Sequence, residues 1–342
     1  MTTANESAYD WHEGWAELPD EPATAAGWAH HGMGVLTNGL VVAFHPGRSA
    51  LLFFEADGRL ADAVPVEATE AHGLTVVVED GEDRLWIADP GAKMTTKQER
   101  ADAAGDPTKQ FDLVVTPGQV IKVALDGTVL QSITRAPRPE YEEGRYAPTW
   151  VAVDEVRLGG SGDVWVADGY GSSLVHRYTA DGTYVSTITG EEGAGRFSCP
   201  HAVLIDRRGP EPVLLVADRG NARVQEFGLD GAYRGVLGVG VLNSPSALAT
   251  SGDLLVVAEL NARVAILDRA GTIVSYEGEN GDATTRPGWP NALDEQGNVV
   301  VPTTEAGHFN SPHGLTVDAD GNIYVAEWLL GGRHVRLAPT TP

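Results

Sequence analysis

The sequence predicts an all-β fold, a six-bladed β-propeller whose blades are four-stranded antiparallel sheets. Three observations favour it. The 342 residues include 41 glycines and 20 prolines, which interrupt helices and provide the dihedral angles of tight turns. A short phrase with alternating apolar residues recurs six times, and a turn of Asp-Gly or Ala-Gly type follows most of its copies. Closed repeat folds of this length can remain one domain, so we expect a single domain over residues 1–342.

Each repeat unit opens with a histidine, serine or threonine. Alternating apolar residues, a turn and a second apolar run follow, as in HGLTVDADGNIYVAEW, and this alternation predicts two strands joined by a turn. We call the first residue of each unit its lead residue. The six lead residues are His31, His72, Thr149, His201, Ser246 and His313.

Further strands complete most units. The phrases VIKVALDGTV, LVHRYTADGTY, RVQEFGLDGAY and RVAILDRAGTI predict a third strand, a turn and a fourth strand. The last unit ends near residues 337–339, one strand short of a blade. We therefore expect an N-terminal strand around Gly14–Leu18 to complete this blade and close the ring.

Two insertions interrupt the repeats. Residues 90–118 separate the second and third strands of the second blade, and residues 277–311 precede the last blade. Long insertions on a rigid scaffold commonly form lids or binding loops, although surface decoration is about as common. We expect both insertions to lie on the rim of the propeller.

Acidic residues end the second strand of five units. We expect them to cap neighbouring turns or to pair with Arg223 and Arg263, and we assign them no catalytic role, although any of them could orient a metal-bound imidazole. These residues are Asp89, Asp168, Asp218, Glu259 and Glu327.

The charge of the chain limits its partners. A formal net charge of −24 repels nucleic-acid phosphates and anionic lipid head groups, so we expect neither nucleic-acid nor membrane binding, and we infer no obligate protein partner. The single cysteine, Cys199, cannot form an internal disulfide. The polar N-terminus does not resemble a secretion signal, and no apolar run is long enough to span a bilayer, so we expect a cytoplasmic location.

Three of the lead residues predict a metal site. His72, His201 and His313 fall in the second, fourth and sixth blades, and a closed ring would direct their imidazoles towards one axis. Neutral imidazoles from alternate blades can bind one ion and leave a coordination position open, which favours zinc and allows other divalent transition metals. The alternative is that these histidines cap or pack at strand starts. His31 occupies the same position in the first blade, either as a local repeat feature or as part of the channel rim.

The chain resembles a known family. The phrases DGNIYVAE, NARVQEF and NARVAIL resemble NHL repeats, and this resemblance covers the chain from about Gly27 to Leu337. Within that superfamily the chain is similar to the peptidyl-α-hydroxyglycine α-amidating lyases. The resemblance implies a six-bladed propeller with zinc held by three histidines from alternate blades. It also implies cleavage of the C–N bond of a carbinolamide, which yields a peptide amide and glyoxylate without a nucleotide or flavin.

Two phrases carry the catalytic residues of that family. VWVADGYGSSLV resembles its Asp-Gly-Tyr segment, which implies that Tyr170 is the catalytic base, and VADRGNARVQEF resembles its Asp-Arg segment, which implies that Arg219 faces the same cavity. A metal and Arg219 could then lower the pKa of the Tyr170 phenol. Alternatively, Tyr170 packs on a neighbouring turn and Arg219 pairs with Asp168 or Asp218.

The chain also departs from the family. Pro46 replaces an arginine that helps to bind substrate, which leaves His45 and Arg48 as the candidates for that role. Beside the third histidine, Ser311 replaces a methionine and Gly314 replaces an aspartate. Ser311 makes the pocket wall more polar and is a further substrate-binding candidate. The missing carboxylate argues against a structural calcium.

These observations favour a metal-dependent lyase that cleaves the C–N bond of an α-hydroxy amide, either a small molecule or a peptidyl-α-hydroxyglycine. Two alternatives remain open. The propeller could be a non-catalytic NHL scaffold that binds proteins. It could also be a metal-dependent hydrolase similar to the lactonase-like propellers, although their carboxylate-rich calcium set has no match in this sequence.

Overall fold

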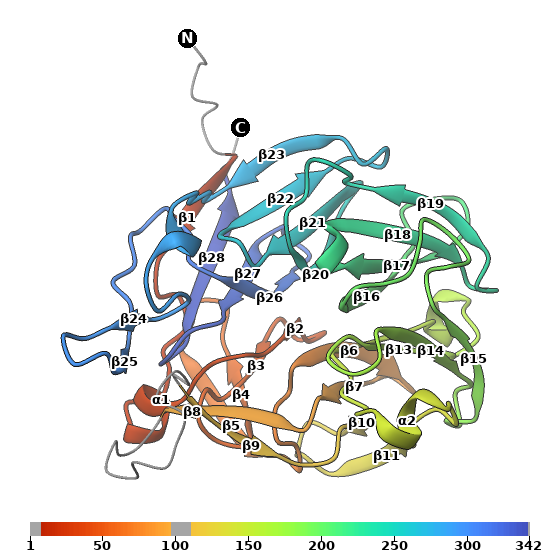
Figure 1. Ribbon diagram of the computed structural model, residues 1–342, viewed down its shortest axis with the longest axis horizontal. Helices are drawn as coiled ribbons and strands as arrows, with labels where there is room; N and C mark the ends of the chain where they lie inside the picture. The colour runs from red at the N-terminus through yellow and green to blue at the C-terminus, as the bar shows by residue number, and fades with distance from the viewer. Residues whose placement is uncertain (1–7, 97–110, 341–342) are drawn as a thin grey trace.

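The computed structural model describes residues 8–96 and 111–340, which form a ring of six four-stranded antiparallel sheets (Figure 1). A cavity lined by residues of all six first strands lies at the centre of the ring, and we call this central space the channel. The predicted six-bladed propeller is confirmed. In each sheet the first strand of the unit lies at the channel, where it contacts the first strands of the neighbouring blades.

The strands of each blade follow the predicted repeat units. The first two blades comprise β2 (Met33–Val35), β3 (Val41–Phe44), β4 (Ala50–Phe54) and β5 (Leu60–Pro65), and then β6 (Gly73–Glu79), β7 (Glu82–Asp89), β10 (Gln119–Val123) and β11 (Val129–Ile133). The third and fourth comprise β12 (Trp150–Val153), β13 (Val164–Asp168), β14 (Leu174–Tyr178) and β15 (Tyr184–Ile188), and then β16 (Pro200–Asp206), β17 (Val213–Asp218), β18 (Arg223–Gly228) and β19 (Tyr233–Leu237). The last two comprise β20 (Pro245–Ser251), β21 (Leu254–Glu259), β22 (Arg263–Leu267) and β23 (Ile273–Glu277), and then β26 (Pro312–Val317), β27 (Ile323–Glu327), β28 (Arg333–Pro339) and β1 (Tyr9–His12).

The N-terminal strand closes the ring, as predicted, but from a different place. Strand β1 pairs antiparallel with β28, with Tyr9 opposite Pro339, so the predicted position at Gly14–Leu18 is wrong. Gly14 has a φ of 56° and turns the chain out of the strand. Trp15 then enters the core, where its ring centroid lies 4.7 Å from that of Tyr324.

The two insertions lie where the sequence places them. In the first, β8 (Ala92–Thr96) and β9 (Phe111–Val115) form a hairpin between β7 and β10, and residues 97–110 lie outside the described residues. The second contains the short pair β24 (Ala292–Leu293) and β25 (Val299–Val300). The helices are α1 (Pro22–Ala26) and α2 (Glu140–Glu143), with 3₁₀ turns at Val156–Leu158, Arg219–Asn221 and Ala283–Thr285. None of the helices in the described ranges is long and apolar enough to cross a membrane.

The core lies between blades. Second strands such as β13, β17 and β21 are buried along almost their whole length, because neighbouring blades cover both of their faces. Fourth strands such as β15 and β23 begin with alternating half-buried and exposed residues, because they form the outer edge of the ring.

Glycines allow the innermost strands to approach each other. A Cβ atom added to Gly314 would lie 2.3 Å from the carbonyl oxygen of His31, and one added to Gly73 would lie 2.4 Å from that of Thr149. Both distances are far shorter than a van der Waals contact. Close packing of the blades therefore accounts for the glycine that stands at position 314.

This packing predicts the effect of a single methyl group. Gly314→Ala should destabilise the protein by about 2 kcal/mol, the usual cost of overpacking a tight contact. Gly235→Ala is the matched control, because Gly235 also lies in a strand, in β19, but has open space around its Cβ position. Urea unfolding of both variants measures the difference. Equal stabilities would contradict the proposed approach of the first and sixth blades.

Candidate metal centre

Three lead residues meet in the channel. His72, His201 and His313 are almost completely buried. Their ring centroids are separated by 4.8 Å for His72 and His201, 4.6 Å for His72 and His313, and 4.9 Å for His201 and His313. The structure thus brings together the three residues that the sequence analysis singled out as metal ligands.

Backbone carbonyl groups orient the three imidazoles. In each histidine, Nδ1 faces a carbonyl oxygen of the next blade around the ring, and because a carbonyl oxygen can only accept, Nδ1 carries the proton. The unprotonated Nε2 atoms therefore keep their lone pairs. The pairs are His72 with Thr149 at 2.7 Å, His201 with Ser246 at 2.6 Å and His313 with His31 at 3.4 Å.

The other lead residues complete a ring of hydrogen bonds. Thr149 donates its hydroxyl to the Pro200 carbonyl at 3.1 Å, and Ser246 donates to the Pro312 carbonyl at 3.0 Å. The backbone amide of Gly32 donates to the Ala71 carbonyl at 3.3 Å. Together with the three imidazoles, these contacts join every blade to the next. We call this set the lead-residue ring.

The acids at the ends of the second strands hold the turns that lead into this ring. Each accepts hydrogen bonds from backbone amides two or three residues before a lead residue, which confirms the predicted capping role. The pairs are Asp89 with Thr69 and Glu70, Asp168 with Ala147, Asp218 with Ser198, Glu259 with Asn243 and Ser244, and Glu327 with Asn310 and Ser311. The expected ion pairs also form, since Arg223 lies 2.8 Å from Asp218 and Arg263 lies 2.5 Å from Glu259.

Tyr170 and Arg219 lie at the same point. The Tyr170 hydroxyl lies 3.2 Å from Nε2 of His72 and 3.0 Å from Nε2 of His201. Arg219 donates from Nη1 to this hydroxyl over 3.4 Å, and its guanidinium group lies 5.3 Å from the centre of the phenol ring. Both residues follow the ends of second strands, β13 and β17, at the same mouth of the channel.

Burial dominates the protonation of these groups. It lowers the pKa of His72 to about 3 and holds the pKa values of His201 and His313 well below their usual range, so all three imidazoles are neutral at pH 7. Burial also raises the pKa of Tyr170 to about 12, because it outweighs the lowering by Arg219. The protein side chains alone therefore do not produce the lowered pKa that the sequence analysis expected, and the phenol is neutral.

The Nε2 lone pairs of the three histidines outnumber the hydrogen-bond donors that the described residues offer them. The single Tyr170 proton can satisfy only one of the Nε2 atoms of His72 and His201. The Nε2 atom of His313 is buried and has no hydrogen-bond partner among the described residues. Buried polar atoms without partners are rare in proteins. Three neutral imidazoles with inward lone pairs are a donor set that fits a zinc ion.

A fourth histidine belongs to the cluster. The ring centroid of His30 lies 4.5 Å from that of His72 and 4.4 Å from that of His313, and its Nε2 lies 3.0 Å from the Tyr170 hydroxyl. Ligand atoms of His30, His72 and His313 all lie within 4.8 Å of one another, a group that does not include His201. His30 had no predicted role. The available signal was the tandem His30-His31, since successive residues of an extended chain point to opposite sides.

His31 itself has a different place. Its backbone carbonyl belongs to the lead-residue ring, whereas its imidazole turns to His334, with the two Nε2 atoms 3.1 Å apart. The side chain at this lead position therefore does not join the four-histidine cluster.

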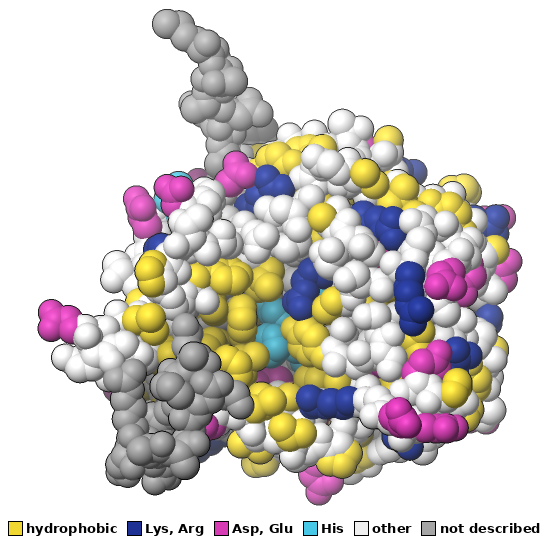
Figure 2. Space-filling model, in the orientation of Figure 1, with side chains coloured by type: hydrophobic (Ala, Val, Ile, Leu, Met, Phe, Trp, Pro, Cys, Tyr) yellow, Lys and Arg dark blue, Asp and Glu magenta, His cyan; other side chains and the backbone are white. Residues whose placement is uncertain are grey.

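An apolar cavity lies over the cluster. It has a volume of about 370 Å³, and His30, His313, Tyr170 and Arg219 form part of its lining. The other lining residues are Pro90, Ala92, Met94, Phe111, Leu113, Arg145, Leu260 and Trp328. Figure 2 shows histidine side chains at the bottom of an opening bordered by hydrophobic side chains. We call this space the histidine cavity. Because the hairpin β8–β9 contributes to its wall, the described part of the first insertion lies on the rim, as expected.

The three substrate-binding candidates lie elsewhere. His45 and Arg48 both contact Glu21, with Nε2 of His45 and Nη2 of Arg48 at 2.9 and 2.5 Å from its carboxylate oxygens. Ser311 is buried and donates its hydroxyl to the Trp328 carbonyl at 2.7 Å. None of the three is among the described residues that line the histidine cavity.

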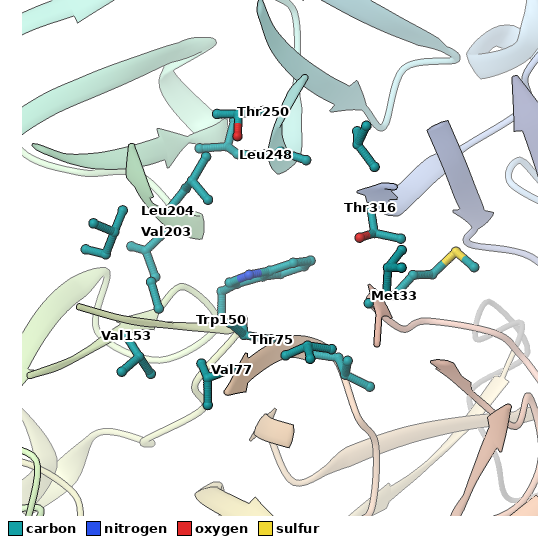
Figure 3. Close-up of a pocket in the computed structure, with 18 of the residues that line it drawn as sticks. Met33, Thr75, Val77, Trp150, Val153, Val203, Leu204, Leu248, Thr250 and Thr316 are labelled. Carbon is teal, nitrogen blue, oxygen red and sulfur yellow. The ribbon is translucent and has the colours of Figure 1, made fainter. Parts of the chain in front are cut away.

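The opposite end of the channel has a different character. A cavity of about 280 Å³ there is lined by side chains from the first strands of all six blades, and the Trp150 ring extends into it (Figure 3). Its described lining is mainly aliphatic, with threonine hydroxyls, one carboxylate, Glu155, which pairs with Arg157, and no histidine. The candidate catalytic groups are therefore confined to one mouth of the channel.

A buried polar network supports the loop that carries Tyr170. Asp168, at the end of β13, accepts hydrogen bonds from the Tyr141 hydroxyl at 2.6 Å and from the Ser172 amide at 2.7 Å. Because Tyr141 gives its proton to Asp168, Nε2 of His176, 2.6 Å away, donates to the Tyr141 oxygen. The network fixes both ends of the segment that contains Tyr170.

Comparisons with known proteins agree with this architecture. Residues 309–334 match the NHL repeat family. The chain is 27% identical over 314 residues to the mouse protein named NHL repeat-containing protein 3, a match that spans 87% of this chain and 76% of the relative. It is also 27% identical over 278 residues to peptidyl-alpha-hydroxyglycine alpha-amidating lyase 1 of Drosophila melanogaster, a match that spans 75% of this chain and 42% of the relative.

Among solved structures, the chain is similar to selenomethionine-substituted virginiamycin B lyase from Staphylococcus aureus. The TM-score is 0.55 at 14% identity, with 96% of this chain and 99% of the other covered. A likeness at this identity concerns the fold. The family match and the two relatives confirm the resemblance to NHL repeat proteins and, distantly, to amidating lyases.

The Asp168 network predicts a dependence of stability on pH. Burial lowers the pKa of His176 to about 3, from an ordinary value near 6.5. The unfolded chain takes up this proton below about pH 6.5 and the folded chain does not, so the contribution of His176 to stability is complete above pH 6.5 and falls as the pH drops towards 3. Between pH 7.5 and 5.0 the wild type should lose about 2 kcal/mol more than His176→Gln. Urea unfolding at the two pH values measures this, and equal losses would contradict the assignment.

Proposed function

We propose that this protein is a metal-dependent lyase that cleaves the C–N bond of an α-hydroxy amide, with a peptidyl-α-hydroxyglycine as one possible substrate. The observation that carries the proposal is a set of unprotonated Nε2 atoms beneath a cavity. Those of His72 and His201 lie 3.2 and 3.0 Å from the Tyr170 hydroxyl, and that of the neighbouring His313 is buried without a partner among the described residues. The distant relationship to a protein named as an amidating lyase supports the reaction type.

We assign the metal to His72, His201 and His313. These three share the Nδ1 contact with a carbonyl oxygen of the next blade, which fixes the tautomer that a metal ligand requires. Among the described residues, no carbonyl oxygen holds Nδ1 of His30 in this way, and the printed contact of its ring is that of Nε2 with the Tyr170 hydroxyl. When bound, zinc would supply positive charge that polarises a substrate oxygen and favours the phenolate form of Tyr170.

The protein residues then have separate tasks. As the phenolate, Tyr170 would accept the proton of the substrate hydroxyl, and Arg219 would stabilise the negative charge that develops nearby. As the C–N bond breaks, its electron pair goes to the amide nitrogen and the carbinol carbon becomes a carbonyl. The proton on Tyr170 passes to that nitrogen, so the products are an amide and an aldehyde and the residue returns to its starting state.

Metal content tests the ligand assignment. The purified wild type should contain about one zinc per chain, and His72→Ala, His201→Ala and His313→Ala should each lose most of it, because three ligands are needed for tight binding. His30→Ala and the exposed His308→Ala should retain it. Elemental analysis of the five variants provides the measurement.

The same variants distinguish two ligand sets. Loss of zinc in His30→Ala with retention in His201→Ala would replace the proposed set by His30, His72 and His313. A wild type without any metal would contradict the proposed centre altogether.

Glyoxylate release tests the reaction. With an N-acyl-α-hydroxyglycine as substrate, Tyr170→Phe should lower kcat by about 100-fold or more, the usual contribution of a positioned base. Tyr233→Phe, on the outer strand β19, is the matched control and should remain active. A fully active Tyr170→Phe would refute the role of the phenol.

A scaffold function is the second candidate. The relative named NHL repeat-containing protein 3 matches 87% of this chain, and its name states no activity. A wild type that contains no metal and releases no glyoxylate would favour this candidate over the lyase.

A further inference from the structure

The charged residues that line the histidine cavity are opposite in sign to the net charge of the protein. The chain has 48 acidic and 24 basic residues, yet the described lining of this cavity includes two arginines, Arg145 and Arg219, and no acidic residue. Positive charge beside apolar walls attracts anions more strongly than the same charge in open water. The cavity is therefore built for a ligand of negative charge.

Arg219 is already engaged at the base of the cavity. Its Nη1 donates to the Tyr170 hydroxyl at 3.4 Å, and its Nη2 lies 3.3 Å from Sγ of Cys199. Both terminal nitrogens thus contact the protein beside the imidazoles. Arg219 is placed to act on the phenol, and it is poorly placed to bind a second group at the mouth.

Arg145 is placed differently. It lies between α2 and β12, and its Nη2 donates to the carbonyl oxygens of Pro90 and Gly91 at 2.5 and 2.9 Å, where the first insertion begins. Within the described chain its Nη1 and Nε have no hydrogen-bond partner, and it forms no ion pair. Two carbonyl groups therefore hold the side chain while one edge of the guanidinium remains free for a ligand.

Asp168, the acid that interacts electrostatically with Arg145, does not occupy this edge. Arg145 helps to lower the pKa of Asp168, although burial raises that pKa overall, so the two residues lie within electrostatic reach. Asp168, however, is fully buried and is satisfied by Tyr141, Ala147 and Ser172. It forms no ion pair with Arg145 in the described chain.

The other residues that line the histidine cavity indicate the chemistry of the rest of the ligand. Met94, Phe111, Leu113, Leu260 and Trp328 provide apolar and aromatic surface between the mouth and the imidazoles. A ligand that fits this lining has an apolar body and one anionic group. A carboxylate matches the planar fork of an arginine in geometry as well as in charge.

We propose that Arg145 is a specificity-determining residue that binds the carboxylate of an otherwise apolar substrate. It fills the role that the sequence analysis gave to His45 and Arg48, both of which contact Glu21 instead. The identity of the reaction rests on the proposed function, whereas recognition of the carboxylate can be measured without turnover.

Binding of two matched probes tests the proposal. N-benzoylglycine carries an apolar ring and a carboxylate, and N-benzoylglycinamide is its neutral counterpart. By calorimetry the wild type should bind the acid at least about tenfold more tightly than the amide, as expected for one charge-assisted contact at a partly exposed site. Arg145→Met, which retains the apolar stem, should remove this difference and leave amide binding unchanged.

Two further variants serve as controls. Arg269→Met removes a positive charge from an exposed pair with Asp253 and should bind both probes as the wild type does. Arg145→Lys keeps the charge and should give an intermediate preference, which tests the proposal even if Arg145→Met does not fold. Equal binding of acid and amide by the wild type, or equal effects of Arg145→Met and Arg269→Met, would overturn it.

Turnover separates this inference from the proposed function. With N-benzoyl-α-hydroxyglycine, Arg145→Met should raise KM about tenfold and change kcat by less than about twofold. If neither the wild type nor any variant releases glyoxylate but the preference for the acid depends on Arg145, the proposed lyase function is wrong and the inference about Arg145 stands. If the wild type releases glyoxylate but binds the acid and the amide equally, the proposed lyase function stands and the inference about Arg145 is wrong.

Discussion

The lead-residue ring is the constraint on which the candidate site depends. Each histidine of the even blades gives its Nδ1 proton to the backbone of the next blade, and the threonine and serine of two odd blades continue the circle. The same contacts that join the blades therefore set the imidazole tautomers. Fold and chemistry are coupled here, because a shift between two blades would move a ligand as well.

The candidate site differs in charge from the rest of the molecule. The chain has a net charge of −24, whereas the channel holds neutral histidines and the described lining of the adjoining cavity has two arginines and no acid. Burial keeps the imidazoles unprotonated, and it also raises the pKa of Tyr170 to about 12. The site consequently has lone pairs to offer and lacks a strong base of its own, which is the situation that a bound divalent cation would change.

Much of this could be predicted from the sequence. The repeat phrases fixed the number of blades, and the regular spacing of the lead residues placed three histidines on alternate blades, because a closed ring turns sequence period into radial symmetry. The prediction placed the closing strand a few residues too late in the chain, since no local sequence signal distinguishes Tyr9–His12 from the segment that follows Gly14. Arg145 and His30 lie outside the repeat pattern, in connecting segments whose course depends on tertiary contacts. Periodicity could not assign them to the cavity.

The central claim is that His72, His201 and His313 bind one metal ion together. The most direct measurement is anomalous diffraction at the zinc edge from crystals of the purified protein. We predict a single strong peak in the channel, bonded to the Nε2 atoms of these three histidines, at zinc–nitrogen distances of about 2.0 to 2.1 Å. A channel without an anomalous peak, or a peak bonded to His30 in place of His201, would contradict the account.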